Sequence, residues 1–225
     1  MNYLDLNDLP QSSKAGSRHY WGGLQGSSPG LVLARAALEF PGLSLVLTEN
    51  SRQADRLCAE MEFFLDQQPA DNKLTVLRFP DWETLPYDGF SPHQDIISER
   101  LRTLHQLPQI SHGVLILSVS TLLHRLPPPA YIAANSLKLV LGQNFSIDSM
   151  RHTLEAAGYQ CRDSVFEHGE FAVRGSIMDI FPMGSVCPYR IELFDDEIES
   201  LRQFSPDTQI SSDKVTQISL LPGRE

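Results

Sequence analysis

Cysteine is scarce in this chain of 225 residues, and Cys58, Cys161 and Cys187 are far apart and never arranged as C-x-x-C. An odd number of isolated cysteines disfavours both a disulfide framework and a structural zinc site. Residues 1–11 lack the cationic segment and apolar run of a secretory signal. The sequence also has no apolar run long enough to span a bilayer. We therefore expect a globular protein of the reducing cytoplasm, without a membrane partner.

Positive charge is also in short supply, because 28 Asp and Glu residues outnumber 18 Lys and Arg residues and give a net charge of −10. Neither residues 1–135 nor residues 136–225 carry a net positive charge. A protein that binds nucleic acid by itself usually has a cationic face that displaces counterions from phosphates. The composition disfavours standalone DNA binding, and an acidic chain with local arginines favours a protein partner.

A glycine-rich segment, residues 23–30, has the length and position of a phosphate loop before the first expected helix. A working loop needs a glycine that lets amides face the phosphates, then a lysine, then a hydroxyl that binds Mg²⁺. Those places hold Ser28, Pro29 and Gly30, and proline also removes an amide donor. We predict a degenerate loop that binds no ATP, formed by Gly23, Gly26, Ser28, Pro29 and Gly30.

The same segment also spells the G-x-S-x-G of a hydrolase nucleophile elbow, with Ser28 as its serine. Such an elbow must follow a strand directly, and residues 20–25 are poor strand formers. The serine-hydrolase interpretation is therefore disfavoured.

Acidic and histidine residues raise the separate question of a metal or acid–base site. Glu167 and Glu170 flank His168, and Asp195–Glu197 is an acidic run, so either group has the chemistry to bind a cation or transfer protons. Acidic residues also favour turns at strand ends, and no second ligand group stands at a known spacing. We predict no metal site and no catalytic residue.

Helical and strand patterns alternate along the first part of the chain. Strands are expected at 43–48, 74–79 and 114–118, and helices at 31–40, 51–65, 96–107 and 121–126. Strands rich in Val, Ile and Leu without polar alternation are typical of a buried parallel sheet with helical crossovers. This pattern predicts a doubly wound α/β domain, and Trp82 and Tyr87 are expected to anchor its long loop in the core.

Pro127–Pro129 form the clearest linker, because successive prolines stop helices and hold an extended spacer. Beyond them a strand is expected at 136–141 and a helix at 146–157, with Ser146 as its N-cap and Gly158 after its end. Mostly strands follow, so the sequence predicts a second, α+β domain.

Residues 167–201 alternate as strands do, yet they place arginine and phenylalanine on the side that faces water. In the later strand alternate residues from Tyr189 to Leu193 share the core face, so Arg190 and Phe194 share the outer face. Taking residues 171–181 as one strand puts Arg174 on the outer face as well, together with Met178.

An exposed aromatic residue between arginines is typical of a protein-binding hot spot. The alternative is a solvated hairpin in which Phe194 is tucked under a neighbouring loop, and the alternation alone is equally compatible with both.

Two long blocks carry a family resemblance: DWETLPYDGFSPHQDIIS at 81–98, and residues 167–198, which contain EHGE, Arg174-Gly and FDDEI. The chain closely resembles the N-terminal region of the bacterial transcription-repair coupling factors over nearly all of its length. The second block is also similar to domain 2 of the excision-repair protein UvrB. UvrB has an intact phosphate loop and a tyrosine-rich hairpin that clamps DNA, and this chain has neither, which favours the coupling factors.

The resemblance implies a UvrB-like domain 1A at 1–130, with a degenerate P-loop or RecA-like fold. It implies a UvrA-binding domain 2 at 131–221, a smaller α+β domain with an exposed β-hairpin, and the start of a further segment at 222–225. The family's contact residues match Arg174, Arg190 and Phe194. This fragment is expected to have no enzymatic activity and no cofactor, since ATP and Mg²⁺ bind in the family's motor domains.

The implied role is to recruit UvrA to RNA polymerase stalled at DNA lesions, for nucleotide excision repair. The resemblance further implies that RNA polymerase and DNA bind only through more C-terminal parts. In the resting full-length protein, those parts mask the UvrA surface by intramolecular contact. The alternatives are a fragment of a UvrB-type excision-repair protein, and a nucleotide-handling or DNA-handling enzyme domain with an unusual loop.

Overall fold

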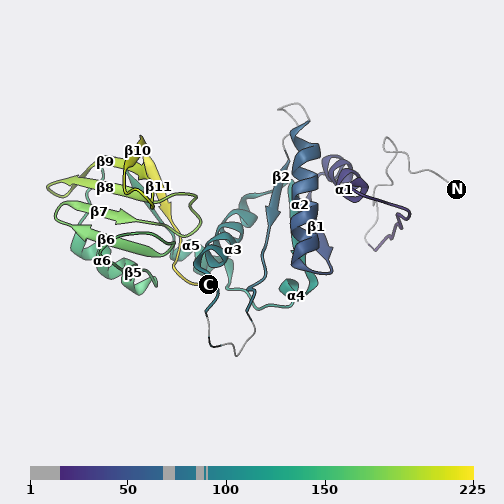
Figure 1. Ribbon diagram of the computed structural model, residues 1–225, viewed down its shortest axis with the longest axis horizontal. Coiled ribbons are helices and arrows are strands. Elements are labelled where there is room, and N and C mark those ends of the chain that lie inside the picture. Colours follow the sequence, from purple (N-terminus) through teal and green to yellow (C-terminus); the bar gives the residue numbers. More distant parts are fainter. Residues whose placement is uncertain (1–15, 68–73, 85–88, 90) are drawn as a thin grey trace. The chain divides into compact units, whose positions relative to one another are not determined.

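Helices and strands alternate in the first half of the chain in the computed structural model, which describes residues 16–67, 74–84, 89 and 91–225 (Figure 1). This half contains α1 (Ser28–Glu39), β1 (Leu43–Thr48), α2 (Ser51–Asp66), β2 (Thr75–Arg78), α3 (Gln94–Gln106), the 3-10 turn η2 (Leu107–Gln109), β3 (Gly113–Ser118) and α4 (Val119–Leu122). The chain divides into two units. Unit 1 comprises Met1–Asp81 and Gln109–His124, and unit 2 comprises Trp82–Pro108 and Arg125–Glu225.

Unit 1 is built on a parallel sheet with the strand order β1-β3-β2. Helix α2 packs on one face of this sheet, because the strands present apolar side chains to it. The resulting core cluster contains Ala54, Cys58 and Met61 of α2 and Val114 and Ile116 of β3. The N-cap Asn50 begins α2 by accepting a hydrogen bond from the backbone N–H of Gln53. The parallel α/β sheet expected from the sequence is therefore confirmed.

On the opposite face of β1, Leu43, Leu45 and Leu47 are all exposed among the residues that the structure describes. A doubly wound arrangement has helices on both faces of the sheet. Only the face that carries α2 has such a layer over β1 in the described part of unit 1. The structure therefore supports the expected parallel α/β sheet. It does not confirm the more specific prediction of a RecA-like domain.

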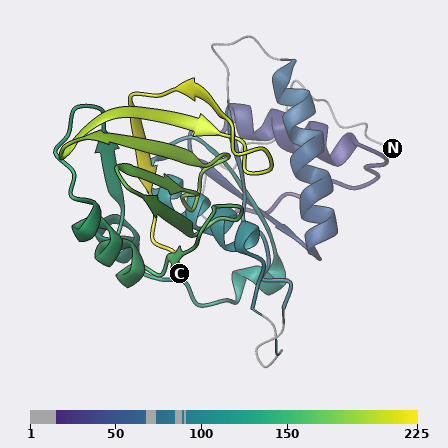
Figure 2. The same ribbon diagram turned by 60° about the vertical axis from the view of Figure 1, so that its left-hand side comes forward.

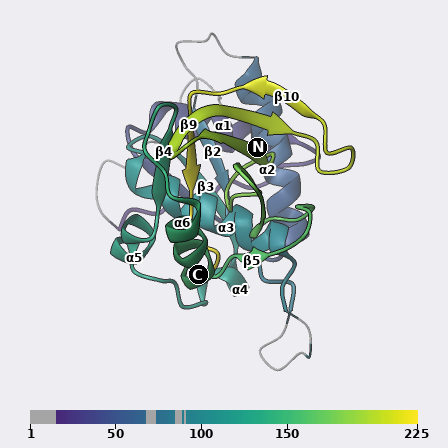
Figure 3. The ribbon, with the colours of Figure 1, turned by 90° about the vertical axis from the view of Figure 1, so that its left-hand side faces the viewer.

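Unit 2 has a different architecture, with α5 (Pro129–Ala134), β4 (Leu137–Val140), α6 (Ile147–Ala156), β5 (Gln160–Cys161), β6 (Glu170–Arg174), β7 (Ile177–Ile180), β8 (Tyr189–Phe194), β9 (Glu197–Phe204), β10 (Ser211–Lys214) and β11 (Gln217–Leu220). Strands β5 to β10 form one sheet in chain order, and β4 pairs with β11 in a second. Helix α6 lies along one face of the larger sheet (Figure 2), and β9 and β10 run side by side at one edge (Figure 3).

The core of unit 2 lies between the inner face of the sheet and its helices. Leu154 of α6 packs with Met178, Ile191 and Leu201 from three neighbouring strands. Leu101 of α3 belongs to the same cluster, so α3 packs within unit 2 although the sequence assigns it to the first domain. The limits at residues 130 and 221 were predicted for the domains of the family, and they stay a prediction.

A buried ion pair joins α3 to the last residue of unit 2. The guanidinium of Arg100, which is 0% exposed, donates from Nε to Glu225 Oε1 at 2.6 Å and from Nη2 to Glu225 Oε2 at 3.1 Å. Its Cζ also lies 4.0 Å from the centre of the Trp82 ring. Trp82 is partly buried by this stacking, and Tyr87 lies outside the described residues.

None of the described helices is both long and apolar enough to cross a membrane.

Neutralising Glu225 removes the charge of the carboxylate that accepts two hydrogen bonds from the buried guanidinium of Arg100. We expect Glu225→Gln to lower the free energy of unfolding by about 3 kcal/mol, because removing one charge of a buried ion pair is strongly destabilising. Urea denaturation measures the change. The control Glu155→Gln removes an exposed partner of Arg151 on α6, and its effect should stay below about 1 kcal/mol. Equal losses in the two variants would contradict the expectation.

Candidate functional site

The outer face of the six-stranded sheet carries the residues that the sequence singled out, with one correction to its register. Residues 171–181 form two strands, because the chain reverses at Gly175 and Ser176 and Arg174 pairs with Ile177. Gly175 has a φ of 61°, a conformation that favours glycine. A two-residue turn puts its flanking residues on the same face, so the side-chain alternation shifts after it.

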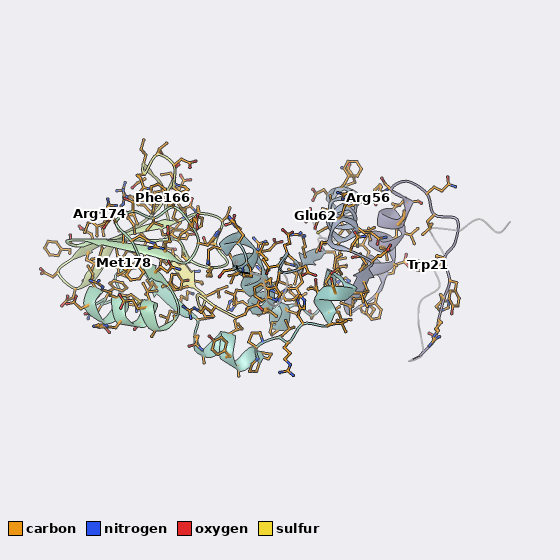
Figure 4. The ribbon with its side chains drawn as sticks, turned by 60° about the horizontal axis from the view of Figure 1, so that its bottom comes forward. Trp21, Arg56, Glu62, Phe166, Arg174 and Met178 are labelled. Atoms are coloured by element: carbon orange, nitrogen blue, oxygen red, sulfur yellow. The ribbon has the colours of Figure 1, made fainter. Side chains whose placement is uncertain are left out.

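The shift moves Met178 away from Arg174. The prediction that these two residues share the outer face is therefore wrong: Met178 is fully buried in the core, whereas Arg174 is exposed (Figure 4). On β7 the residues that share the face of Arg174 are Ile177 and Asp179, and Asp179 pairs with Ala172 of β6 and Arg190 of β8.

The three predicted contact residues differ in exposure. Phe194 is 69% exposed at the end of β8, so it is not tucked under a loop. The Arg174 side chain is 51% exposed and that of Arg190 only 17%. The register of β8 on β9 shifts here, because Glu199 of β9 is left without a partner, and this shift lets the buried Ile198 lie opposite the buried Leu193.

Asp179 connects the two arginines. Its side chain is completely buried, and Arg190 donates to it twice, from Nε to Oδ1 at 2.7 Å and from Nη2 to Oδ2 at 2.9 Å. Arg174 donates from Nη2 to the same Oδ2. A carboxylate removed from water needs such partners, because an unpaired buried charge is very costly. We name Asp179, Arg174 and Arg190 the arginine cluster.

Arg190 also holds the loop between β9 and β10. Its Nη1 donates to the backbone oxygen of Gln209 at 3.4 Å and to Ser211 Oγ at 3.2 Å, and its Cζ lies 5.0 Å from the centre of the Phe204 ring. The hydrogen bonds to Asp179 raise the pKa of Arg190 above its usual value. Arg190 is thus anchored on all its nitrogens, whereas Arg174 extends toward solvent.

Sequence reasoning missed Asp179. An acidic residue between Met178 and Ile180, in a strand that is otherwise apolar, was the available signal, because an isolated Asp is almost never buried without a partner. The pairing itself requires the register of β7 on β8, which the shifted alternation concealed.

Beyond Phe194 the turn into β9 contains the acidic run noted in the sequence. Asp195 adopts a φ of 52°, and Phe194 and the acidic residues line a shallow hollow with Asn144 and Phe145. The described residues contain no group of three or more His, Cys, Asp and Glu side chains arranged to hold a metal.

The glycine-rich segment of unit 1 ends in α1, whose first residue is Ser28 and whose first turn contains Pro29. Ser28 Oγ donates to the backbone oxygen of Gln25 at 2.7 Å. Residues 16–27 contain no strand, so the structural context of a hydrolase elbow is missing there.

Side chains from α2 occupy the neighbourhood of this segment (Figure 4). Arg56 donates from Nη2 to the backbone oxygen of Gly26 at 2.7 Å and from Nε to Glu60 at 2.7 Å. Gly30 approaches Glu60 so closely that a Cβ at position 30 would lie 2.5 Å from the Glu60 Cβ. A carboxylate beside the loop repels the phosphates that an active loop attracts.

Residues 137–225 match the UvrB interaction domain family. The chain is 45% identical over 212 residues to the transcription-repair coupling factor of Escherichia coli (strain K12), a match that covers 94% of this chain and 18% of the relative. The corresponding protein of Haemophilus influenzae is 46% identical over 195 residues, and that of Myxococcus xanthus 38% identical over 215 residues. These matches cover 87% and 94% of this chain, and 16% and 18% of the two relatives. The chain thus spans less than a fifth of the length of the curated relatives it matches.

Arg190, which pairs with a buried charge, and Phe194, which is exposed, should contribute differently to the stability of the fold. We expect Arg190→Ala to lower the free energy of unfolding by about 3 kcal/mol, because it leaves much of the buried Asp179 charge unpaired. Phe194→Ala should change it by less than about 0.5 kcal/mol, because the ring is exposed. Urea denaturation of both variants tests this, and a large loss for Phe194→Ala would show that the ring is packed.

Proposed function

We propose, from the premise that this chain is a homologue of the N-terminal region of the transcription-repair coupling factors, that it recruits UvrA in transcription-coupled nucleotide excision repair. The observation that carries the proposal is the UvrB interaction domain at 137–225, whose outer sheet face bears Arg174, Arg190 and Phe194. An exposed aromatic ring near two arginines supports a protein-binding surface.

The binding chemistry follows from the exposure of each residue. Arg174 offers guanidinium N–H groups to a carboxylate of UvrA, and Arg190 holds the face beneath it through Asp179. Phe194 supplies apolar area and fills a pocket of the partner. In a chain with a net charge of −10, such a local pair of arginines selects the docking pose and steers the encounter.

The longer protein would contribute the remaining activities. We propose that ATP-driven translocation on DNA and binding to RNA polymerase belong to parts outside these 225 residues. We also propose that contact with a C-terminal part masks the UvrA surface in the resting protein, and that the protein acts in the cytoplasm. Unit 1 would then be a degenerate RecA-like domain without cofactor, which the occupied surroundings of Gly26 and Gly30 support.

The UvrA proposal predicts a loss of binding when the exposed contact residues are truncated. Phe194→Ala should weaken binding of the 225-residue chain to purified UvrA by roughly 30-fold, since truncating a hot-spot anchor costs about 2 kcal/mol. Arg174→Ala should also weaken it. Calorimetry measures the dissociation constants.

The matched control is Phe63→Ala on α2, because Phe63 is 62% exposed and lies in unit 1. It should leave the affinity unchanged. Absence of binding by the unsubstituted chain would refute the proposed function. An unchanged affinity for UvrA in both Phe194→Ala and Arg174→Ala would show that UvrA binds to another surface of the chain.

The degenerate loop predicts that the chain does not bind ATP. Titration of ATP with Mg²⁺ should give no binding heat, because Pro29 stands in the place of the phosphate-binding lysine and Glu60 lies beside Gly30. UvrB, which has an intact loop, serves as the positive control. A low-micromolar dissociation constant for this chain would favour the alternative of a nucleotide-handling domain.

A further inference from the structure

Asp179 is a charged side chain with no access to solvent on a face that is otherwise suited to bind a partner. It lies at the centre of the outer face, opposite Arg190 in the register of β7 on β8, and accepts hydrogen bonds from both arginines of the cluster. Because it is itself 1% exposed, it has little surface with which to touch a partner. Any contribution it makes to binding must pass through the arginines.

Its effect on the two arginines is unequal. Both Nε and Nη2 of Arg190 point at Asp179, which fixes the plane of that guanidinium. Arg174 is held by Nη2 alone, and in the described part of the chain its Nε and Nη1 have no hydrogen-bond partner. Asp179 thus holds one end of the Arg174 guanidinium, and its Nε–H and Nη1–H groups remain available to a partner.

The cluster itself carries one positive charge, because it holds two guanidinium groups and one carboxylate. Arg202 lies opposite Arg190 on β9 and Lys214 lies opposite Arg202 on β10, so the same face holds further cations that suit an acidic partner. Glu192 also lies on this face, two residues along β8 from Arg190, and lowers the local potential.

We infer that Asp179 is the positioning residue of the UvrA-binding face, an inference that rests on the proposed function. Its buried carboxylate fixes Arg190 through both oxygens and holds Arg174 through Oδ2, and so positions the free N–H groups of Arg174 that receive one acidic side chain of UvrA. A flexible arginine must lose its rotamer freedom on binding, whereas an arginine that is already held loses less.

The inference opposes a simpler electrostatic expectation, and this makes it testable. Replacing Asp179 with Asn removes a negative charge from the face. Charge attraction alone would then give tighter binding to an acidic partner. If Asp179 acts by positioning, the variant should instead bind more weakly, because the arginines lose the ionised acceptor that orients them.

We therefore expect Asp179→Asn to weaken binding of the chain to purified UvrA by about tenfold in calorimetry, with the loss attributable to arginine ordering. The matched control is Glu192→Gln, which also removes one negative charge from this face. No hydrogen bond or ion pair joins Glu192 to an arginine in the described residues. The affinity of the Glu192→Gln variant for UvrA should therefore stay the same or rise. Circular dichroism and thermal unfolding establish that both variants are folded.

A second variant keeps the inference falsifiable if Asp179→Asn does not fold. Asp179→Glu retains the net charge and displaces the carboxylate by one methylene, so it should also weaken binding. Undiminished binding in a folded Asp179→Asn or Asp179→Glu variant would overturn the positioning role while leaving the proposed function intact. An equal loss for Glu192→Gln would also overturn it. Failure of the unsubstituted chain to bind UvrA would refute the proposed function itself.

Discussion

The outer face of unit 2 depends on one constraint, the antiparallel register that places Asp179 opposite Arg190. The two-residue turn at Gly175 and Ser176 sets the neighbouring register of β6 on β7, because it fixes Arg174 opposite Ile177. A slip of one residue would bury the arginines and expose Met178 and Ile191. The same register that forms the core of unit 2 therefore assembles its charged surface.

Unit 1 shows how a loop of the right length can lack the function that its length suggests. A phosphate site requires free backbone amides and positive charge at a helix N-terminus. Here Pro29 removes an amide, and the carboxylate of Glu60 lies close to Gly30. Arg56, the nearby cation, already pairs with Glu60 and with the backbone of Gly26. The side chains of α2 thus stabilise the loop in place of a ligand.

Local sequence pattern predicted much of this fold. The strand at Leu43–Thr48 and the helices α2 and α6 appear close to their expected limits, because apolar runs, Asn50 and Ser146 are local signals. The prolines were a less reliable signal. A linker was expected at Pro127–Pro129, but α5 begins at Pro129, where proline is tolerated in the first turn of a helix. The pairing of Arg100 with Glu225 joins residues 125 positions apart, and no local pattern encodes such a contact.

The site was predictable to a similar extent. Alternation predicted the outer face for Phe194 and Arg174 but left open whether Phe194 is exposed, and the position of Asp179 required the turn at Gly175 to be recognised. Taking residues 171–181 as one strand reversed the alternation of β7, so it hid the acidic residue that accepts hydrogen bonds from both arginines. The identity of the partner came from the family resemblance and not from alternation, because an exposed aromatic ring beside arginines fits many proteins.

The arginine cluster also bears on the choice between a protein and a nucleic acid as the partner. Binding to a phosphate backbone gains free energy from the release of many counterions, which requires several unpaired cations along one surface. The cluster carries one net positive charge, and Asp179 already neutralises the better-ordered arginine. Glu192 lies on the same face, whereas Arg202 and Lys214 continue it with positive charge across β9 and β10. Because its better-ordered arginine is already paired, the cluster itself gains less from a polyanion than from a partner that offers one well-placed carboxylate beside an apolar pocket.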